Sequence, residues 1–324
     1  MAEHAACEVC CACAWRWVVL TVGVAAVLWV LWKRLVVGGE VLRDAAKARR
    51  RGLHVVITGS TKGIGLALAS EFLRHGDSVV VSSRSEEHVS KAVSQLQQQL
   101  SSSSSGPGQV VVGYPCDVTV GEQVNGLAAF AKKQLGSIDI WINNAGVSQA
   151  EKCELWKTPE EVLRSVVNTN LLGCLLGCKA AIRLMLKQPN GGDVFNMDGA
   201  GANGMTTANF AAYGATKHAL PQLMKTLRAE TKGTKVGVHT VSPGMVITDL
   251  LLSGNRNRRA LSIFNILAER PETVARWMVP RIRGVRGSGR YIRFLTLDGV
   301  LWRFLTAWKR RNRFFDLSSS SSSE

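Results

Sequence analysis

The residues best suited to chemistry lie in the stretch YGATK, where Tyr213 and Lys217 are four positions apart. On a helix this spacing stacks a phenol and an amine on one face, where a proton can pass between them. Such a pair is typical of a site that reduces a carbonyl group. A site of this kind normally supplies a serine hydroxyl from the segment upstream, but here VFNMDGAGANG has Asp198 followed by Gly199. Either the site is inactive, or it handles its substrate differently.

A strand, a glycine turn and a helix are expected from His54 onward, in HVVITGSTKGIGLALASEFLRHG. The apolar run suits a buried parallel strand, and Gly59, Gly63 and Gly65 supply the tight turn that a pyrophosphate needs at a helix N-terminus. Further strands, in DSVVVSSR, VVVGYPCDV and IDIWINNAG, follow at the spacing of repeated βα units. The sequence therefore predicts an α/β fold, a doubly wound parallel sheet of Rossmann type in a single domain.

The end of the second strand indicates which nicotinamide cofactor binds. A carboxylate there would bind the ribose hydroxyls of NAD, but this chain has Ser83 and Arg84. Lys62 lies within the glycine loop, so two cations are available for a ribose phosphate. NADPH is the expected cofactor. The alternative for Arg84 is a solvated residue at the start of a helix.

In their order along the chain, these motifs resemble the short-chain dehydrogenase/reductase superfamily over about 190 residues. The motifs are TGSTKGIG from Thr58, CDV with Asp117, NNAG from Asn143, NTNLLG with Asn170, YxxxK from Tyr213 and SPGMVIT from Ser242. Within the superfamily, FNMDGAGANG, VGVHTVSPGMVITDLLLSG, FNILAERPETVARWMVPRIR and the basic aromatic end are similar to the chlorophyll(ide) b reductases of green plants and algae. That similarity runs from about residue 53 to 317.

The resemblance implies NADPH-dependent reduction of the formyl group of chlorophyll(ide) b to the 7-hydroxymethyl form, the first step in pigment conversion or breakdown. It implies that Tyr213 protonates the carbonyl oxygen, and that Lys217 lowers the pKa of the phenol and binds the nicotinamide ribose. Asn170 would complete a proton relay with water, Asp117 would lie near the adenine and Thr248 near the carboxamide. The expected cofactor-binding residues are Gly59, Ser60, Thr61, Lys62, Gly63, Ile64, Gly65, Arg84, Asp117, Asn143, Asn144, Ala145, Gly146, Tyr213, Lys217, Pro243, Gly244 and Thr248.

Asp198 is the fourth candidate catalytic residue, but an ionised carboxylate would oppose the charge that develops on the carbonyl oxygen. Three interpretations remain. Asp198 is protonated by burial, or it points away, or Thr206, Thr207 or a backbone N–H of the GAGANG turn donates instead. The second and third together are favoured. The glycines of the turn leave room for a broad planar macrocycle, or they only shape the turn.

Residues 15–37, WRWVVLTVGVAAVLWVLWKRLVV, form an apolar run with tryptophans near both ends, which predicts one transmembrane anchor. A secretory signal peptide is the alternative, but no small-residue cleavage pattern follows. The basic linker 38–52 should hold the catalytic domain on the cytosol-like side. The resemblance implies the stromal side of a chloroplast thylakoid membrane. The Cys-rich end, residues 1–14, suits reversible acylation or a metal, and no metal site is predicted.

The reductase domain is expected over residues 53–300, with a low-complexity loop at 97–109. The segment 301–317 has Leu301, Trp302, Leu305 and Trp308 at helical spacing before a basic run, a composition suited to a lipid headgroup interface. Packing of the same face against the core is the alternative. Residues 318–324 form a disordered tail by composition.

The net charge of +16, from 40 Lys+Arg against 24 Asp+Glu, suggests an anionic partner. The basic residues flank apolar segments and form no continuous stripe, so nucleic acid is not expected. The expected partners are chlorophyll b or chlorophyllide b, the membrane, antenna complexes or a paralogous reductase, and a second copy of the chain. Two other functions stay open: a membrane-anchored reductase of a lipid carbonyl (retinoid, sterol or ketosphingoid), and a non-catalytic NADP(H)-binding scaffold.

Overall fold

The computed structural model of the chain describes residues 52–102, 108–254 and 257–317. The predicted Cys-rich end, the transmembrane anchor, the basic linker up to residue 51 and the tail at 318–324 lie outside the described residues, as does the centre of the low-complexity loop.

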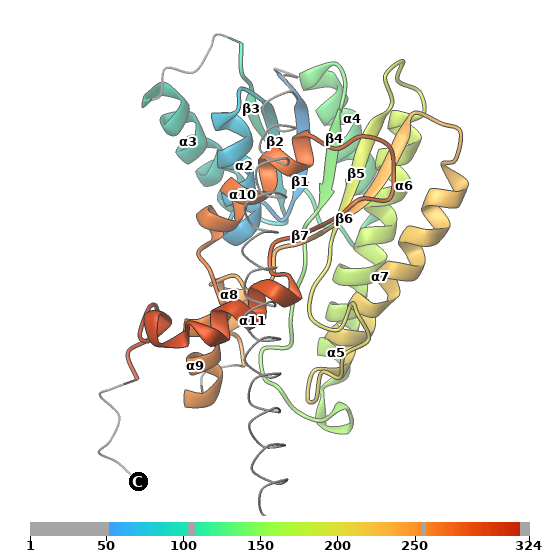
Figure 1. The fold of residues 1–324 in the computed structure, drawn as a ribbon. Helices are drawn as coiled ribbons and strands as arrows, with labels where there is room; N and C mark the ends of the chain where they lie inside the picture. Colours follow the sequence, from blue (N-terminus) through green and yellow to red (C-terminus); the bar gives the residue numbers. More distant parts are fainter. Residues whose placement is uncertain (1–51, 103–107, 255–256, 318–324) are drawn as a thin grey trace, which may run out of the picture. The chain divides into compact units, whose positions relative to one another are not determined.

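Seven parallel strands form one sheet in the order β3-β2-β1-β4-β5-β6-β7 (Figure 1). The strands are β1 (His54–Thr58), β2 (Ser78–Ser83), β3 (Val111–Pro115), β4 (Ile140–Asn143), β5 (Gly192–Met197), β6 (Val236–Ser242) and β7 (Tyr291–Arg293). The order reverses between β1 and β4, which is the topological switch point of a doubly wound sheet. The predicted Rossmann-type fold is confirmed.

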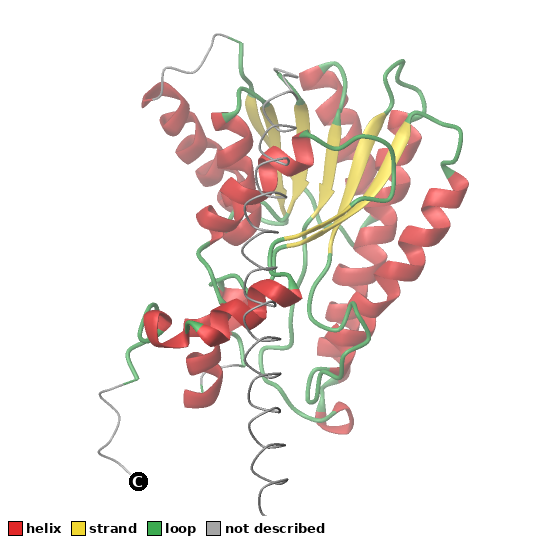
Figure 2. Cartoon of the chain, viewed as in Figure 1, coloured by secondary structure: helices red, strands yellow, loops and turns green. Residues whose placement is uncertain are grey.

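Helices cover both faces of the sheet (Figure 2). They are α2 (Gly63–Arg74), α3 (Glu86–Ser102), α4 (Gly121–Leu135), α5 (Glu160–Val167), α6 (Gly173–Met185), α7 (Ala211–Glu230), α8 (Asp249–Leu252), α9 (Arg258–Leu267), α10 (Pro271–Arg283) and α11 (Leu297–Leu305). Short turns of 3₁₀ helix lie at η1 (Leu155–Lys157) and η3 (Ala307–Arg310), and η2 (Asn168–Leu172) is a π-helical turn.

Strand β1 illustrates why the sheet is buried on both sides. Val55 and Ile57 pack with α2, α3 and α10, whereas Val56 points to the other face and packs with α4, α6 and α7. Because side chains alternate along a strand, a central parallel strand must be apolar at every position. The sheet therefore holds two separate cores and presents its carboxyl edge to the loops that carry the site.

One helical stretch in the described part of the chain, Glu160–Met185, is long and apolar enough to cross a membrane by length and composition. It comprises α5, η2 and α6 in continuous succession. Cys174, Cys178 and Met185 on this stretch are buried in the core beside α4, so packing against the sheet accounts for its apolar face.

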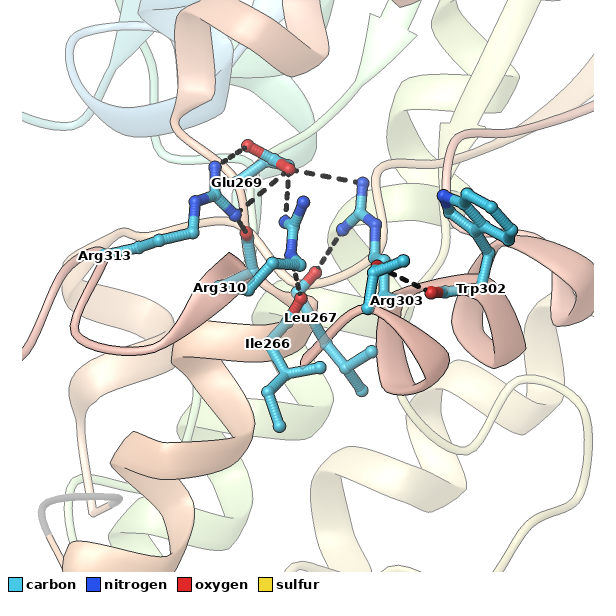
Figure 3. A network of polar contacts seen from close by, with 9 residues as sticks. Ile266, Leu267, Glu269, Trp302, Arg303, Arg310 and Arg313 are labelled. Carbon is cyan, nitrogen blue, oxygen red and sulfur yellow. Dashed lines mark hydrogen bonds and ion pairs between the residues drawn. The ribbon is translucent and has the colours of Figure 1, made fainter. Parts of the chain in front are cut away.

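A buried acidic residue, Glu269, helps to hold the C-terminal segment, residues 301–317, to the domain (Figure 3). Its carboxylate forms ion pairs with Arg303 at 3.3 Å, Arg310 at 2.6 Å and Arg313 at 2.9 Å. Three of the basic residues in this region thus face the protein. Burial acts to raise the pKa of Glu269, but the hydrogen bonds and charges of the arginines outweigh it and lower the pKa. The expected boundary at residue 300 falls inside α11.

Candidate active site

The glycine turn after β1 brings backbone atoms closer together than side chains would allow. Gly59 has a φ of +62°, and a Cβ atom there would lie 2.7 Å from the Cα atom of Ala145. A Cβ at Gly65 would lie 2.4 Å from the Gly59 carbonyl oxygen and 2.5 Å from Nδ2 of Asn144. Among the described residues no side chain caps α2 at Lys62, so the N–H groups of its first turn are available to an anion.

The segment after β4 is fastened to this turn by hydrogen bonds. The Thr58 hydroxyl accepts the N–H groups of Asn144 and Ala145, both at 3.1 Å. The Asn144 amide in turn donates to the carbonyl oxygens of Thr58 at 2.8 Å and Gly59 at 2.9 Å. Asn143 is different, because its side chain is buried between Trp141 and β5 and bonds to Asn196 at 2.7 Å. Asn143 therefore supports the sheet.

The end of β2 presents polar groups without partners. The Oγ atoms of Ser82 and Ser83 are buried and have no hydrogen bond within the described residues. Arg84, which follows them, is exposed and makes no ion pair in that part of the chain. Ser60 is buried and already occupied, since its hydroxyl donates to the Ile57 carbonyl at 2.6 Å and accepts the Ser82 N–H at 2.9 Å.

Lys62 is not placed beside Arg84 by any contact. Its ammonium forms an exposed ion pair with Asp249 at 2.7 Å, which ties the glycine turn to the start of α8. Thr248 caps that helix and lies 3.2 Å from the position of a Cβ at Gly63. Asp117 after β3 accepts hydrogen bonds from the N–H and hydroxyl of Thr119, at 2.9 and 2.8 Å, and so shapes its own turn.

Tyr213 and Lys217 lie side by side on α7, and both are buried. The Lys217 ammonium donates to the Met197 carbonyl oxygen at 3.0 Å and lies 5.6 Å from the centroid of the Tyr213 ring. Burial raises the pKa of Tyr213, with a further increase from the charge of Asp198, and burial lowers the pKa of Lys217. The phenol is thus a weaker acid than free tyrosine, and the lowering of its pKa that was expected from Lys217 is not found.

Asn170 lies in the π-helical turn η2, a distortion that is frequent at functional sites. Its amide makes a reciprocal pair with the backbone of Val147, where Oδ1 accepts the N–H and Nδ2 donates to the carbonyl, both at 2.9 Å. Nδ2 also lies 3.4 Å from the hydroxyl of Thr216, which neighbours Lys217 on α7. Asn170 thus joins the segment after β4 to the helix that carries the tyrosine.

The Asp198 carboxylate is turned toward β7. Its Oδ2 atom accepts a short hydrogen bond from the Tyr291 hydroxyl, and Arg293 donates to that same hydroxyl at 2.7 Å. Oδ1 is buried without a well-formed hydrogen bond in the described chain, although the Ser242 hydroxyl is near enough to stabilise the charge. Burial raises the pKa of Asp198, while Tyr291, Ser242 and Lys217 act to lower it.

Gly199, and not Asp198, faces the tyrosine hydroxyl. A Cβ atom at Gly199 would lie 2.3 Å from the Tyr213 hydroxyl oxygen and 3.3 Å from Cε of Lys217. Thr207 does not replace a serine here, because its hydroxyl donates to the Phe210 carbonyl at 3.4 Å and packs on Gly214. The sequence had indicated Gly199 only as a source of room, and no pattern had pointed to Tyr291.

A sequence profile described as short chain dehydrogenase matches residues 53–259. The chain belongs to the short-chain dehydrogenase family. Its fold agrees with a short-chain dehydrogenase/reductase from Mycobacterium marinum, with a TM-score of 0.64 and 25% identity over 76% of this chain and 95% of that one.

Two relatives of this short-chain dehydrogenase are plant proteins. A probable chloroplastic chlorophyll(ide) b reductase of Oryza sativa subsp. japonica is 47% identical over 89% of this chain and 60% of its own length. A chloroplastic chlorophyll(ide) b reductase of Arabidopsis thaliana is 48% identical over 75% of this chain and 70% of its own length. The chain spans only about three fifths of the rice relative.

The short-chain dehydrogenase fold implies a nicotinamide cofactor, and the residues present fit one. The glycine turn leaves no space for side chains. In the part of the chain that the structure describes, the first turn of α2 has uncapped N–H groups, and the hydroxyls of Ser82 and Ser83, at the end of the neighbouring strand, have no partner. Buried polar groups without partners carry a free-energy cost that a bound ligand can remove.

Proposed function

We propose that this chain is an NADPH-dependent reductase that converts the 7-formyl group of chlorophyll b or chlorophyllide b to the hydroxymethyl group. The observation that carries the proposal is the 47–48% identity to chlorophyll(ide) b reductases, which extends over 75% or more of the chain. The arrangement of Tyr213, Lys217 and Asn170 supports it, because these residues supply an acid, a buried cation and a fixed amide at one end of the sheet.

In this reaction the bound NADPH supplies the hydride. Tyr213 donates the proton to the carbonyl oxygen, and its raised pKa means that it holds this proton throughout the neutral pH range. Lys217 is fixed by its bond to the Met197 carbonyl, which places a positive charge behind the phenol as the tyrosinate forms. Asn170 keeps Val147 and α7 in register beside the acid.

The choice of NADPH rests on the end of β2. Arg84 is an exposed guanidinium, which can bind a ribose phosphate through two parallel hydrogen bonds. Lys62 can add to this binding only by leaving Asp249, and an exposed ion pair of that kind costs about 1 kcal/mol or less to break. Arg84 is therefore the principal contact with the phosphate, and Lys62 is a secondary one.

We place the protein at a thylakoid membrane with its catalytic domain on the stromal side. The predicted anchor at residues 15–37 supports this placement by composition, and both plant relatives are named as chloroplastic. The described chain adds an apolar surface on α11 and η3, made of exposed residues Leu297, Leu301, Phe304, Leu305 and Trp308. This surface suits a lipid interface, and antenna complexes, a paralogous reductase or a second copy of the chain are its further proposed partners.

The decisive experiment incubates the purified full chain with NADPH and either chlorophyllide b or a panel of retinoid, sterol and ketosphingoid carbonyls. Formation of the 7-hydroxymethyl pigment, followed by its absorption spectrum, is the expected result. Turnover of a lipid carbonyl with no pigment reduction would replace the proposal with the lipid reductase. NADPH binding with no turnover of any substrate would identify a scaffold.

A further inference from the structure

A lysine outside the catalytic group lies close to the active-site tyrosine. The ammonium of Lys152, in the loop between β4 and α5, is 4.7 Å from the centroid of the Phe210 ring. Phe210 stacks on Tyr213, with ring centroids 4.5 Å apart and an interplanar angle of 23°. The ammonium is thus separated from the catalytic ring by one aromatic side chain.

The position of Lys152 is fixed by a third segment. A Cβ atom at Gly254, which follows α8 and has a φ of +67°, would lie 3.1 Å from Cγ of Lys152 and 3.2 Å from its backbone nitrogen. The loop after β4, the end of α8 and the start of α7 therefore meet at this side chain. Because the aliphatic part of Lys152 is already packed, the side chain loses less conformational entropy when it binds a ligand.

The charge of Lys152 has no acidic partner within the described residues. It takes part in no ion pair or hydrogen bond there, although it is only partly exposed. The desolvation that accompanies this partial burial lowers the pKa of Lys152. Contact with the Phe210 ring offsets only about 0.5–1 kcal/mol of the cost of removing an ammonium from water. The group that suits such a site is an anion, and a carboxylate oxygen can accept a charge-assisted hydrogen bond from the ammonium.

We propose that Lys152 binds a carboxylate of the substrate and so selects chlorophyllide b, with its free propionate, over chlorophyll b, in which the propionate is esterified. This inference rests on the proposed pigment-reducing function. The formyl and propionate groups are carried by opposite five-membered rings of the planar macrocycle. One pigment molecule can therefore present its formyl group to Tyr213 while its propionate lies at the rim of the site.

The test compares chlorophyllide b with its methyl ester, because these two pigments differ in charge and hardly in size. In the full-length protein, Lys152→Met should lower kcat/KM for chlorophyllide b roughly 10- to 100-fold, which is the loss of one charge-assisted hydrogen bond. The value for the methyl ester should change less than about twofold. The loss should appear mainly in KM, since the contact is equally strong before and during the reaction. Lys152→Arg should retain most of the preference.

Lys157→Met is the matched control, since Lys157 is an exposed lysine of the same connection and is paired with Glu154 at 3.1 Å. Lys157→Met should leave kcat/KM for both pigments unchanged. An equal decrease for the acid and the ester in Lys152→Met would show a structural role, and no decrease would exclude contact with the substrate. Either result overturns the inference.

Failure of the proposed function is distinguishable from failure of this inference. If the wild-type protein reduces neither pigment, the proposed function fails, and the carboxylate site is then tested by binding, with the affinities for chlorophyllide b and its methyl ester compared by fluorescence quenching. Tighter binding of the acid that disappears in Lys152→Met supports the site. Equal affinity of the wild-type protein for the acid and the ester, or no binding of the acid, refutes it.

Discussion

Replacing Gly199 by alanine should disable the acid without disturbing the cofactor. The new methyl carbon would lie 2.3 Å from the Tyr213 hydroxyl oxygen. A carbon and an oxygen in contact are normally about 3.3 Å or more apart, so the hydroxyl must move by about 1 Å. A misplacement of that size costs roughly 100-fold in rate, or about 2.7 kcal/mol in the activation barrier.

The measurement is kcat for chlorophyllide b at saturating NADPH, together with NADPH affinity from fluorescence. Gly199→Ala should lower kcat about 100-fold and leave the affinity within about twofold. Gly121→Ala is the control, because a Cβ there would lie 3.6 Å from Cδ2 of Leu176, which is ordinary contact. A Gly199→Ala protein with the wild-type kcat would refute the placement of the phenol. Gly199→Ser should also have a lowered kcat, because it too introduces a Cβ atom beside the Tyr213 hydroxyl.

Four other substitutions test separate parts of the site and fold. Tyr213→Phe should abolish formyl reduction and leave NADPH affinity nearly intact, as turnover and binding assays will show. Arg84→Asp should weaken NADPH binding by about 1.5–3 kcal/mol and shift preference toward NADH, measured as the ratio of the two dissociation constants. Tyr291→Phe removes a hydrogen-bond donor that stabilises the ionised carboxylate of Asp198, so the pKa of Asp198 should rise. The pH profile of kcat/KM should shift accordingly, and superimposable profiles of the wild type and the variant would contradict this. Glu269→Gln should weaken the attachment of the C-terminal segment, which Asn265 also holds, and should speed its cleavage by trypsin. Because the folded pKa of Glu269 is lowered, the wild-type ion pairs should be lost as the pH falls through that pKa.

The parts of the fold that the sequence predicts correctly are those set by neighbouring residues. The runs 55–58 and 79–81 are apolar or β-branched and are followed by glycine or polar residues, so strands and their order along the chain are readable. The tight turn predicted at Gly59 is present, since this glycine has a φ of +62°, whereas its close approach to Ala145 was not predicted. The NNAG and YxxxK segments lie at the carboxyl end of the sheet because every parallel strand ends there.

The contacts that escape prediction join residues far apart in the chain. Asp198 and Tyr291 are separated by 93 positions, and β7 has only three residues, too short to show a pattern. The C-terminal segment has a composition that fits either a membrane interface or the protein core. In the structure Arg310 binds Glu269, so one side of the segment packs against the protein, while Trp308 on the segment is exposed. Only the fold brings the acidic partner to the basic run.

The missing serine does not by itself argue against catalysis, because the neighbours of Asp198 limit the harm of its charge. Its carboxylate bonds to Tyr291, and Arg293 donates to the same phenol and stacks its guanidinium 4.5 Å from that ring centroid. A positive charge is thus coupled to the carboxylate on the side of β7, which reduces its repulsion of a developing oxyanion. Burial raises the pKa of Tyr213, and the remaining negative charge of Asp198 raises it further; an acid in the proposed role keeps its proton until hydride transfer and so tolerates that increase. In the proposed mechanism, the space left by Gly199 gives the carbonyl oxygen access to the phenol, and a serine side chain at that position would fill this space.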